Sequence, residues 1–398
     1  MSNVSDYLKW RGDLDFSQAP FNDVDNLILA QIAYVDFTDI VPAPGSIETI
    51  TIAEAADTFF DTHDEKEIKK CKSFIGKAPY LLREAAATKR FGSLILTNYV
   101  DYVDGGKEEQ FAAFHVRIDN RLTYIAFRGT DDTLVGWKED FNMSFLSPVP
   151  SQKDAVRYID TTVQRSEGKL ILGGHSKGGN LATYASSQVE PSLQDRIKQI
   201  YSFDAPGLNH TIIETEGYQS IASKIKRYIP QGSIVGMMLE TPKQAHIVKS
   251  VAIGGIAQHD TFSWQIENEH FVLLDTLNPD SIQTDKTLKE WVETVPDDEL
   301  KDFFDVFFGL ILDAQITSID EFFQPNSIKK LLTIVQNAHA LTGQEKEMLS
   351  RLTRLLISIR YQAWIDDFKT PSPMAFMTDV RESWTSLAER FSFSNKDE

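Results

Sequence analysis

Apolar residues follow two different spacings along this chain of 398 residues, and the change from one to the other marks its elements. In DNLILAQIA (residues 25–33) and across residues 53–89 they recur at helical intervals, with breaks at Gly76 and Pro79. After residue 93, the β-rich runs LILTNYVDYVD, FAAFHVRI and LTYIAF alternate with turn residues. We therefore expect helices over residues 1–92, followed by the antiparallel start of a sheet.

The pattern after residue 150 alternates between helices and strands. Residues 153–163 have helical spacing, KLILGG is a short buried strand that ends in a tight turn, and QIYSF, KRYIP and HIVKSVAI are further strands. TFSWQI and HFVLL suggest a late strand pair near the sheet edge. Such alternation predicts an α/β fold, with a mixed, mostly parallel sheet flanked by helices on both faces.

Beyond about residue 280 the spacing is almost wholly helical, in DELKDFFDVFFGLILDAQ, SIKKLLTIVQNAHA and EKEMLSRLTRLLISIRYQAWIDDF. We therefore expect an α/β domain over residues 1–280 and a C-terminal helical extension over residues 281–398. Aromatic pairs at helical spacing usually belong to a core rather than to an exposed lid or membrane-touching face. This predicts that four phenylalanines of the extension are buried: Phe303, Phe304, Phe307 and Phe308.

The amino-acid composition limits which classes of binding partner and which cellular compartment fit this protein. The formal net charge of −18 and the pI near 4.9 argue against nucleic acid or an anionic membrane as the main partner, since both need a basic surface. Cys71 is the only cysteine, so no intramolecular disulfide can form, which fits a reducing compartment. The first residues lack the features of a signal peptide, and no apolar run approaches the length of a membrane span. We expect a cytoplasmic protein without a transmembrane segment.

The candidate chemistry centres on GHSKG, residues 174–178. This run matches the G-x-S-x-G turn that exposes the nucleophilic serine of α/β-hydrolases between a strand and a helix. The strand KLILGG leads into it, and the small residues of GGNLATYA follow as a helix that can pack close to the sheet. The alternative is a glycine-rich turn with an idle serine. We take Ser176 as the candidate nucleophile.

A serine hydroxyl is a weak nucleophile at neutral pH, so Ser176 needs a histidine base and a carboxylate that orients this base. Asp204, in IYSFDAPGL, ends an apolar strand and enters a turn at the sheet edge, where such an acid can lie. The more usual place follows the next strand, in YIPQGSIVG, and offers no carboxylate until Glu240. Asp204 is therefore the candidate acid, and a turn-capping aspartate is the alternative.

Five histidines follow Asp204. His259, in GGIAQHDTFSW, belongs to a glycine-preceded loop late in the α/β domain, where the base of this fold is expected. His246 begins a strand and is the alternative base, whereas Asp260 is too close in sequence to orient His259 well. The other three are disfavoured because they lie soon after the acid, within a strand and in the helical tail: His210, His270 and His339.

Acyl transfer also needs hydrogen-bond donors for the developing oxyanion. One is the backbone N–H of Lys177, the residue after the serine. The run LTYIAFRGTDD supplies a second loop, in which Gly129 permits a close approach and Thr130 offers its N–H and its hydroxyl. A plain β-turn is the alternative for this loop. We expect Thr130 and Lys177 to form the oxyanion hole.

These residues occur in motifs that resemble a known family. FRGTDD followed by GWKEDF resembles the lipase class 3 pattern, in which an F-R-G-[ST] turn gives an oxyanion donor and a Trp and an Asp anchor the loop. Trp137 and Asp140 match these two positions. Over about residues 21–264 the chain is similar to the bacterial Mbeg-like family of lipase-like α/β-hydrolases. The motifs that carry this similarity are FNDVDNLILAQIAYVDF, QFAAFHVRI, FRGTDDTLVGWKEDFNMSF, GHSKGGNLATYA, FDAPGL, IPQGSIVGMML and QHDTFSW.

The resemblance implies an α/β-hydrolase fold with Ser176 as nucleophile, and its Q-H-D-x-F-S-W motif falls on His259. It implies no particular substrate. Two features depart from class 3 lipases: Lys177 stands where they usually have an apolar residue, and the acid position after the later strand is empty. Some animal lipases carry the acid on the earlier strand, as Asp204 would. Both departures point away from true triacylglycerol lipase activity.

The sequence thus predicts a serine hydrolase that cleaves a carboxylic ester, a thioester or a related small acyl or lipid-like substrate, with no metal or organic cofactor. The N-terminal helices and the helical tail are expected to roof the site. A second hypothesis is a catalytically degenerate α/β-hydrolase fold that binds a ligand or partner. A third is a peptidase or acyltransferase with the same triad. Convergence of Ser176, Asp204 and His259 is the geometric test between enzyme and scaffold.

Overall fold

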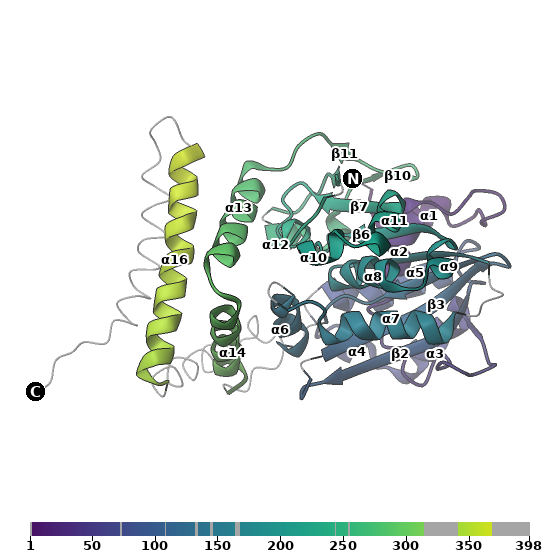
Figure 1. Ribbon diagram of the computed structural model, residues 1–398. Helices are drawn as coiled ribbons and strands as arrows, with labels where there is room; N and C mark the ends of the chain where they lie inside the picture. Colours follow the sequence, from purple (N-terminus) through teal and green to yellow (C-terminus); the bar gives the residue numbers. More distant parts are fainter. Residues whose placement is uncertain are drawn as a thin grey trace, which may run out of the picture.

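The computed structural model describes residues 2–71, 74–107, 109–131, 134–143, 146–163, 168–242, 244–253, 255–313 and 341–367. Figure 1 shows an α/β body with three helices beside it, namely α13 (Pro279–Thr294), α14 (Asp297–Asp313) and α16 (Gly343–Asp367). The helix predicted in SIKKLLTIVQNAHA and the residue His339 lie outside the described residues.

Within the described residues, the body is built on a sheet of nine strands in the order β1-β2-β3-β4-β5-β6-β7-β8-β11. Strands β4 to β8 run parallel, and the pairs at both ends of the sheet are antiparallel. The strands are β1 (Ile50–Thr51), β2 (Ile95–Asp104), β3 (Glu109–Asp119), β4 (Leu122–Phe127), β5 (Lys169–His175), β6 (Ile197–Phe203), β7 (Ile225–Pro230), β8 (His246–Val248) and β11 (Leu273–Leu274). The antiparallel start and the parallel centre confirm the predicted fold class.

The central parallel strands β4 and β5 contribute apolar side chains to the cores on both faces of the sheet, as expected for strands that helices cover on two sides. In β5 every residue after Lys169 is buried. Because parallel strands all end at the same edge of a sheet, the loops after β4, β5, β6 and β8 gather at one edge. These four loops carry Thr130, Ser176, Asp204 and His259.

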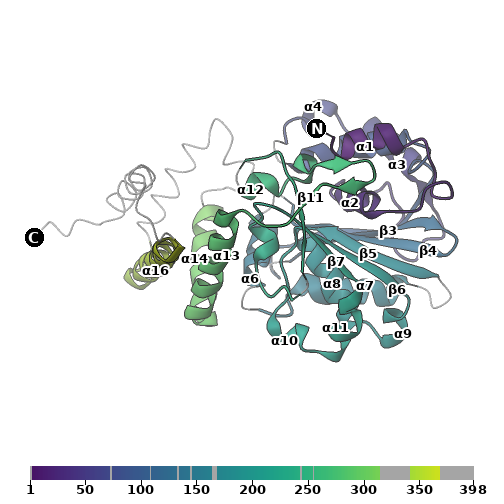
Figure 2. The same ribbon diagram turned by 90° about the horizontal axis from the view of Figure 1, so that it is seen from above.

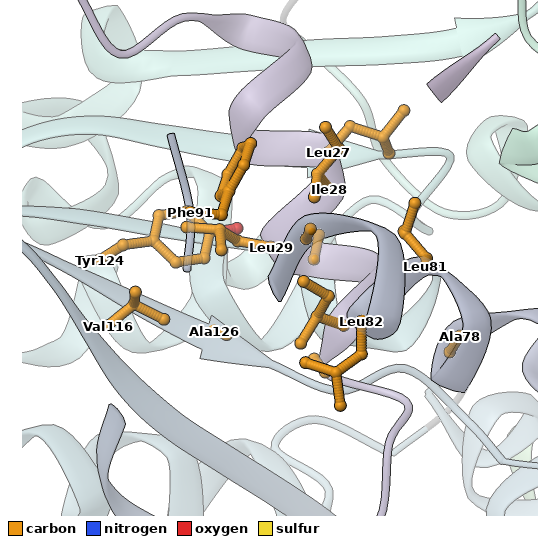
Figure 3. Packing of buried hydrophobic residues seen from close by; sticks show 14 of the residues in the cluster. Leu27, Ile28, Leu29, Ala78, Leu81, Leu82, Phe91, Val116, Tyr124 and Ala126 are labelled. Carbon is orange, nitrogen blue, oxygen red and sulfur yellow. The ribbon is translucent and has the colours of Figure 1, made fainter. Parts of the chain in front are cut away.

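Helices cover the two faces of the sheet, as Figure 2 shows. One face packs against the N-terminal helices, and Figure 3 shows apolar side chains of α2 and α5 against those of β3 and β4. The other face packs against α7, α8 and α11. The helices of the body are α1 (Val4–Arg11), α2 (Asp23–Ile32), α3 (Ile52–Thr62), α4 (Glu65–Ile68), α5 (Ala78–Ala86), α6 (Leu134–Asn142), α7 (Pro150–Thr162), α8 (Lys177–Gln188), α9 (Pro191–Gln194), α10 (His210–Ile213), α11 (Glu216–Ile221) and α12 (Gly255–Gln258).

The N-terminal helices cover one face of the sheet, and the expectation that they also roof the site stays a prediction. Helix α2 starts at a capping box: the Asn22 side chain accepts from the Asp25 N–H at 3.1 Å, and Asp25 accepts from the Asn22 N–H at 2.9 Å. Asp25 also forms a fully buried ion pair with Arg90. These contacts fix α2 and the chain that follows it, which reaches the site through Tyr34.

Two expectations near the sheet edge need correction. The strand predicted in HIVKSVAI ends at Val248, since the Ser250 hydroxyl turns the chain by accepting from the Ala252 N–H at 3.1 Å. TFSWQI starts as a short 3-10 helix that Asp260 caps through the Phe262 N–H, at 3.0 Å. The predicted break at Gly76 and Pro79 is confirmed, since a new helix, α5, begins at Ala78 with Pro79 in its first turn. Of the late strands, β11 pairs with β8, while β9 (Ile266–Glu267) and β10 (His270–Phe271) pair with each other.

The C-terminal helices α13, α14 and α16 surround an apolar cluster of their own. Phe304 and Phe308 are 5% and 3% exposed, so these two belong to a core as predicted. Phe303 is partly buried against the cluster, whereas Phe307 is 43% exposed and contradicts the prediction. Residues four apart share one face of a helix, and only one such face points inward here. The domain boundary expected at residue 280 stays a prediction.

Candidate active site

Ser176 lies in a sharp turn between β5 and α8. Its backbone has φ 56° and ψ −136°, a left-handed conformation that is unfavourable for a residue with a side chain. Two glycines make the turn sterically feasible, because a Cβ atom on Gly174 would lie 2.4 Å from the carbonyl carbon of Gly178. A strained serine between strand and helix is the arrangement that G-x-S-x-G predicts.

Asp204, directly after β6, is fully buried and holds His259. The Asp204 Oδ2 atom is 2.7 Å from His259 Nδ1, while Oδ1 accepts hydrogen bonds from the Gly236 N–H, at 3.1 Å, and from the Ser233 hydroxyl. Because a carboxylate only accepts, His259 Nδ1 carries the proton, which leaves Nε2 as the ring atom able to accept one. The structure thus brings together the acid and the histidine that the sequence singled out.

His175, the residue before Ser176, connects the turn to the His259 segment. Its Nε2 is 2.9 Å from the His259 carbonyl oxygen, its Nδ1 is 2.9 Å from the Tyr34 hydroxyl, and the two imidazole rings lie 4.3 Å apart. Burial keeps the pKa of His175 well below its ordinary value, so the ring is neutral. A carbonyl only accepts, so Nε2–H donates to it and the Tyr34 hydroxyl donates to Nδ1.

The loop after β4 lies against the same turn. A Cβ atom on Gly129 would be 2.4 Å from the His175 carbonyl oxygen and 3.0 Å from the Ser176 Cβ, so only glycine fits there. The next residue, Thr130, is buried and donates its hydroxyl to Asp140 Oδ2 on α6. Burial raises the pKa of Asp140 to about 6. The predicted loop therefore lies beside the serine, and Asp140 anchors it.

The remaining predicted residues lie as follows. The backbone of Trp137 is part of α6, and its side chain lies outside what the structure describes. His246 begins β8, is exposed and stacks on the Tyr228 ring at 4.9 Å, so the structure favours His259 as the partner of Asp204. Asp260 forms an ion pair with Lys77. The backbone N–H of Lys177 opens α8, directly after the serine.

Only a small part of the site faces solvent. Ser176 and His259 are each 7% exposed. A cavity of about 170 Å³ lies elsewhere, between α13 and residues 208–240, and is lined by none of the three candidate triad residues. The described residues contain no group of three His, Cys, Asp or Glu side chains placed to bind a metal ion. None of the described helices is long and apolar enough to span a lipid bilayer.

The parallel centre of the sheet, with a strained serine turn after β5, defines the α/β-hydrolase fold. Within this class, the chain belongs to the Mbeg1-like family, whose model matches residues 85–309. A comparison with curated proteins gave no match. Among solved structures, the chain is similar to one described as the crystal structure of M37 lipase, with 14% identity and a TM-score of 0.33, over 53% of this chain and 68% of that chain.

Sequence reasoning missed the contacts that link the site residues to one another. Tyr34 and His175 are 141 positions apart, and Lys177 pairs with Glu139, 38 positions away. The histidine inside G-x-S-x-G was visible as a polar residue in a buried turn, which is a signal that it needs partners. Nothing in the sequence indicated which residues these partners are.

Proposed function

We propose that this protein is a serine hydrolase that cleaves a carboxylic ester, a thioester or a related small acyl substrate with Ser176, His259 and Asp204. One observation carries the proposal: the buried Asp204 carboxylate holds His259 Nδ1 at 2.7 Å, while the His259 carbonyl is tied to the residue before Ser176. A carboxylate–histidine pair beside a strained serine turn is the arrangement that nucleophilic catalysis by serine requires.

The proposed chemistry follows from these roles. The Ser176 oxygen attacks the acyl carbon while its proton passes to His259 Nε2, and the backbone N–H groups of Thr130 and Lys177 hold the resulting oxyanion. The C–O or C–S bond then breaks, and His259 returns the proton to the leaving alcohol or thiol. Water, deprotonated by His259, hydrolyses the acyl-enzyme. Asp204 orients the imidazole and stabilises its charged form throughout.

The pairing of His259 with Asp204 favours an enzyme over a degenerate scaffold. Asp204 is buried, one of its oxygens faces His259, and the other accepts from Ser233 and Gly236. A binding scaffold would not require a carboxylate held in this way. We further propose a cytoplasmic location, from the single cysteine, and a hydrolase domain over residues 1–280 with a helical extension over residues 281–398.

Rates on a series of p-nitrophenyl esters and acyl thioesters of increasing acyl length test the function. We expect wild-type turnover, none with Ser176→Ala, and a kcat roughly 10³–10⁴-fold lower with Asp204→Asn. Asp260→Asn is the matched control, because it removes a carboxylate next to His259 that pairs with Lys77 instead. Equal turnover by wild type and Ser176→Ala would refute the proposal.

A further inference from the structure

Helix α6 carries three consecutive charged residues, and each is bound to a different part of the molecule. Asp140 accepts from Thr130 in the proposed oxyanion loop. Glu139 pairs with Lys177, the first residue of the helix after the serine. Lys138 pairs with Asp305 of the C-terminal helix α14, at 2.6 Å. One helix thus contacts both residues proposed as oxyanion donors and the C-terminal helices as well.

The pair between Lys177 and Glu139 is rigidly held. Both side chains are fully buried, with 2.8 Å between Lys177 Nζ and Glu139 Oε2. Lys177 Nζ also donates to the Gln110 carbonyl at 2.9 Å, and Glu139 accepts from the N–H groups of Gln110 and Ser151, at 3.2 and 3.0 Å. A buried charge pair with its other bonds satisfied specifies one geometry, because separating the charges would leave each of them unsolvated. This pair explains why a lysine can follow Ser176, where an apolar residue would fit a buried position.

The C-terminal helices support α6 from the opposite side. Figures 1 and 2 both show α6 between α14 and the sheet, and the two helices are in contact. Asp305 accepts from Lys138 and also from Lys301, one turn earlier on its own helix. Nearby, Phe304 and Phe308 anchor α14 in the apolar cluster with α13 and α16. The position of Asp305 is therefore set by the packing of the C-terminal helices.

We propose that α6 positions both oxyanion donors and that the C-terminal helices hold α6 in place through Asp305. Glu139, the Lys177 side chain and Asp305 are then positioning residues for acyl transfer. The inference rests on the proposed function. Its physical basis is that oxyanion stabilisation depends on donors fixed in advance, and a shift of about 1 Å can cost up to 10²-fold in rate. The helical extension is then a working part of the site and not an independent appendage.

The test compares Asp305→Asn with Asp302→Asn, which removes the same charge from an exposed position on the same helix. Two readouts are used: kcat and KM on the best ester, and hydrogen–deuterium exchange of the amides of residues 128–131. For Asp305→Asn we expect kcat about 10-fold lower with KM little changed, together with faster exchange in this loop. Asp302→Asn should change neither, and Asp305→Glu, which keeps a carboxylate for Lys138 and Lys301, should stay closer to wild type in both readouts.

The outcomes separate the inference from the proposed function. Loop exchange and kcat that both stay at wild-type values in Asp305→Asn would overturn the inference while the hydrolase stands. A wild-type protein whose Ser176 neither turns over esters nor reacts with a fluorophosphonate would overturn the proposed function, and with it the catalytic role of α6. The double variant Lys177→Met with Glu139→Gln provides a second check that leaves no unpaired buried charge, and it should lower kcat without unfolding the protein.

Discussion

The two ring nitrogens of His175 have different hydrogen-bonding roles, because one donates and the other accepts. Nε2–H fixes the main chain of His259, and Nδ1 can accept only because the Tyr34 hydroxyl donates to it. Without that donor the neutral ring can carry its proton on Nδ1 instead, and Nε2 would then face the His259 carbonyl with a lone pair. The His259 carbonyl, which can only accept, requires the proton on Nε2, and the Tyr34 hydroxyl stabilises this tautomer by donating to Nδ1.

Tyr34→Phe should lower kcat about 10-fold with little change in KM, because the base is less well placed while substrate binding is unaffected. Tyr201→Phe is the control, since it also removes a hydroxyl bonded to a side chain, here Asp23, away from the site. Both variants should lose a similar stability of ~1 kcal/mol in urea unfolding. Equal kcat values in Tyr34→Phe and Tyr201→Phe would show that the hydrogen bond from Tyr34 to His175 contributes to stability alone and does not position His259.

Asp140 makes stability depend on pH. Burial raises its pKa from 3.8 to about 6 in the folded protein, so the folded state holds this proton more strongly than the unfolded state. Stability is therefore lost as pH rises from about 4 to about 6 and is constant above that range. Asp140→Asn keeps an acceptor for the Thr130 hydroxyl but has no ionisable group, so the loss of stability between pH 4 and pH 6 should be absent. We expect it to be about 1–3 kcal/mol more stable than wild type at pH 8, with the gain vanishing near pH 4. Urea unfolding of both proteins over this pH range measures it, and a pH-independent difference would contradict the account.

At the scale of elements, the site is formed by four loops at one edge of the parallel strands. The strand, turn and helix around Ser176 could be predicted because glycine spacing and apolar runs are local signals. Chain order limited the acid and the base to residues after Ser176, and the strand end before Asp204 and the glycine-preceded loop of His259 then favoured these two. The short 3-10 helix after His259 was missed, because capping by Asp260 outweighed the strand preference of the apolar residues. The links through Tyr34 and Lys177 depend on packing between distant segments, which no local pattern encodes.

Gly129→Ala tests how closely the loop after β4 approaches the serine turn. Its Cβ atom would lie 2.4 Å from the His175 carbonyl oxygen, a backbone atom that cannot rotate away. The loop must shift, so we expect kcat to fall at least about 100-fold. Gly105→Ala, in an exposed turn where a Cβ atom would have no neighbour within 4 Å, is the control. Retention of wild-type kcat by Gly129→Ala would mean that this loop does not take part in catalysis.

The described part of the chain has separate apolar cores on the two faces of the sheet and a third among the C-terminal helices. The core of the C-terminal helices has few contacts with the sheet. The α/β body and the C-terminal helices meet, among other places, where α6 contacts α14. This arrangement was partly visible in the sequence as a change from mixed to helical spacing near residue 280. What the sequence could not show is that α14 contacts α6, the helix whose Asp140 holds Thr130 in the loop proposed to bind the oxyanion.

Phe304→Ala should destabilise the C-terminal helices selectively. Removing a buried phenylalanine typically costs about 3–5 kcal/mol. If the helical extension unfolds as a unit of its own, calorimetry should show its transition shifted to lower temperature, with the transition of the α/β body unchanged. A single transition that shifts as a whole would contradict the proposed boundary at residue 280.

The proposed chemistry requires Ser176 to be an activated nucleophile. The most direct measurement is to treat the purified protein with a small fluorophosphonate probe and to map the modified residue by mass spectrometry, with Ser176→Ala and His259→Gln alongside. We expect a covalent adduct on Ser176 in the wild type, none in Ser176→Ala, and strongly slowed labelling in His259→Gln. A folded wild-type protein that stays unlabelled, or is labelled equally fast without His259, would contradict the proposed chemistry.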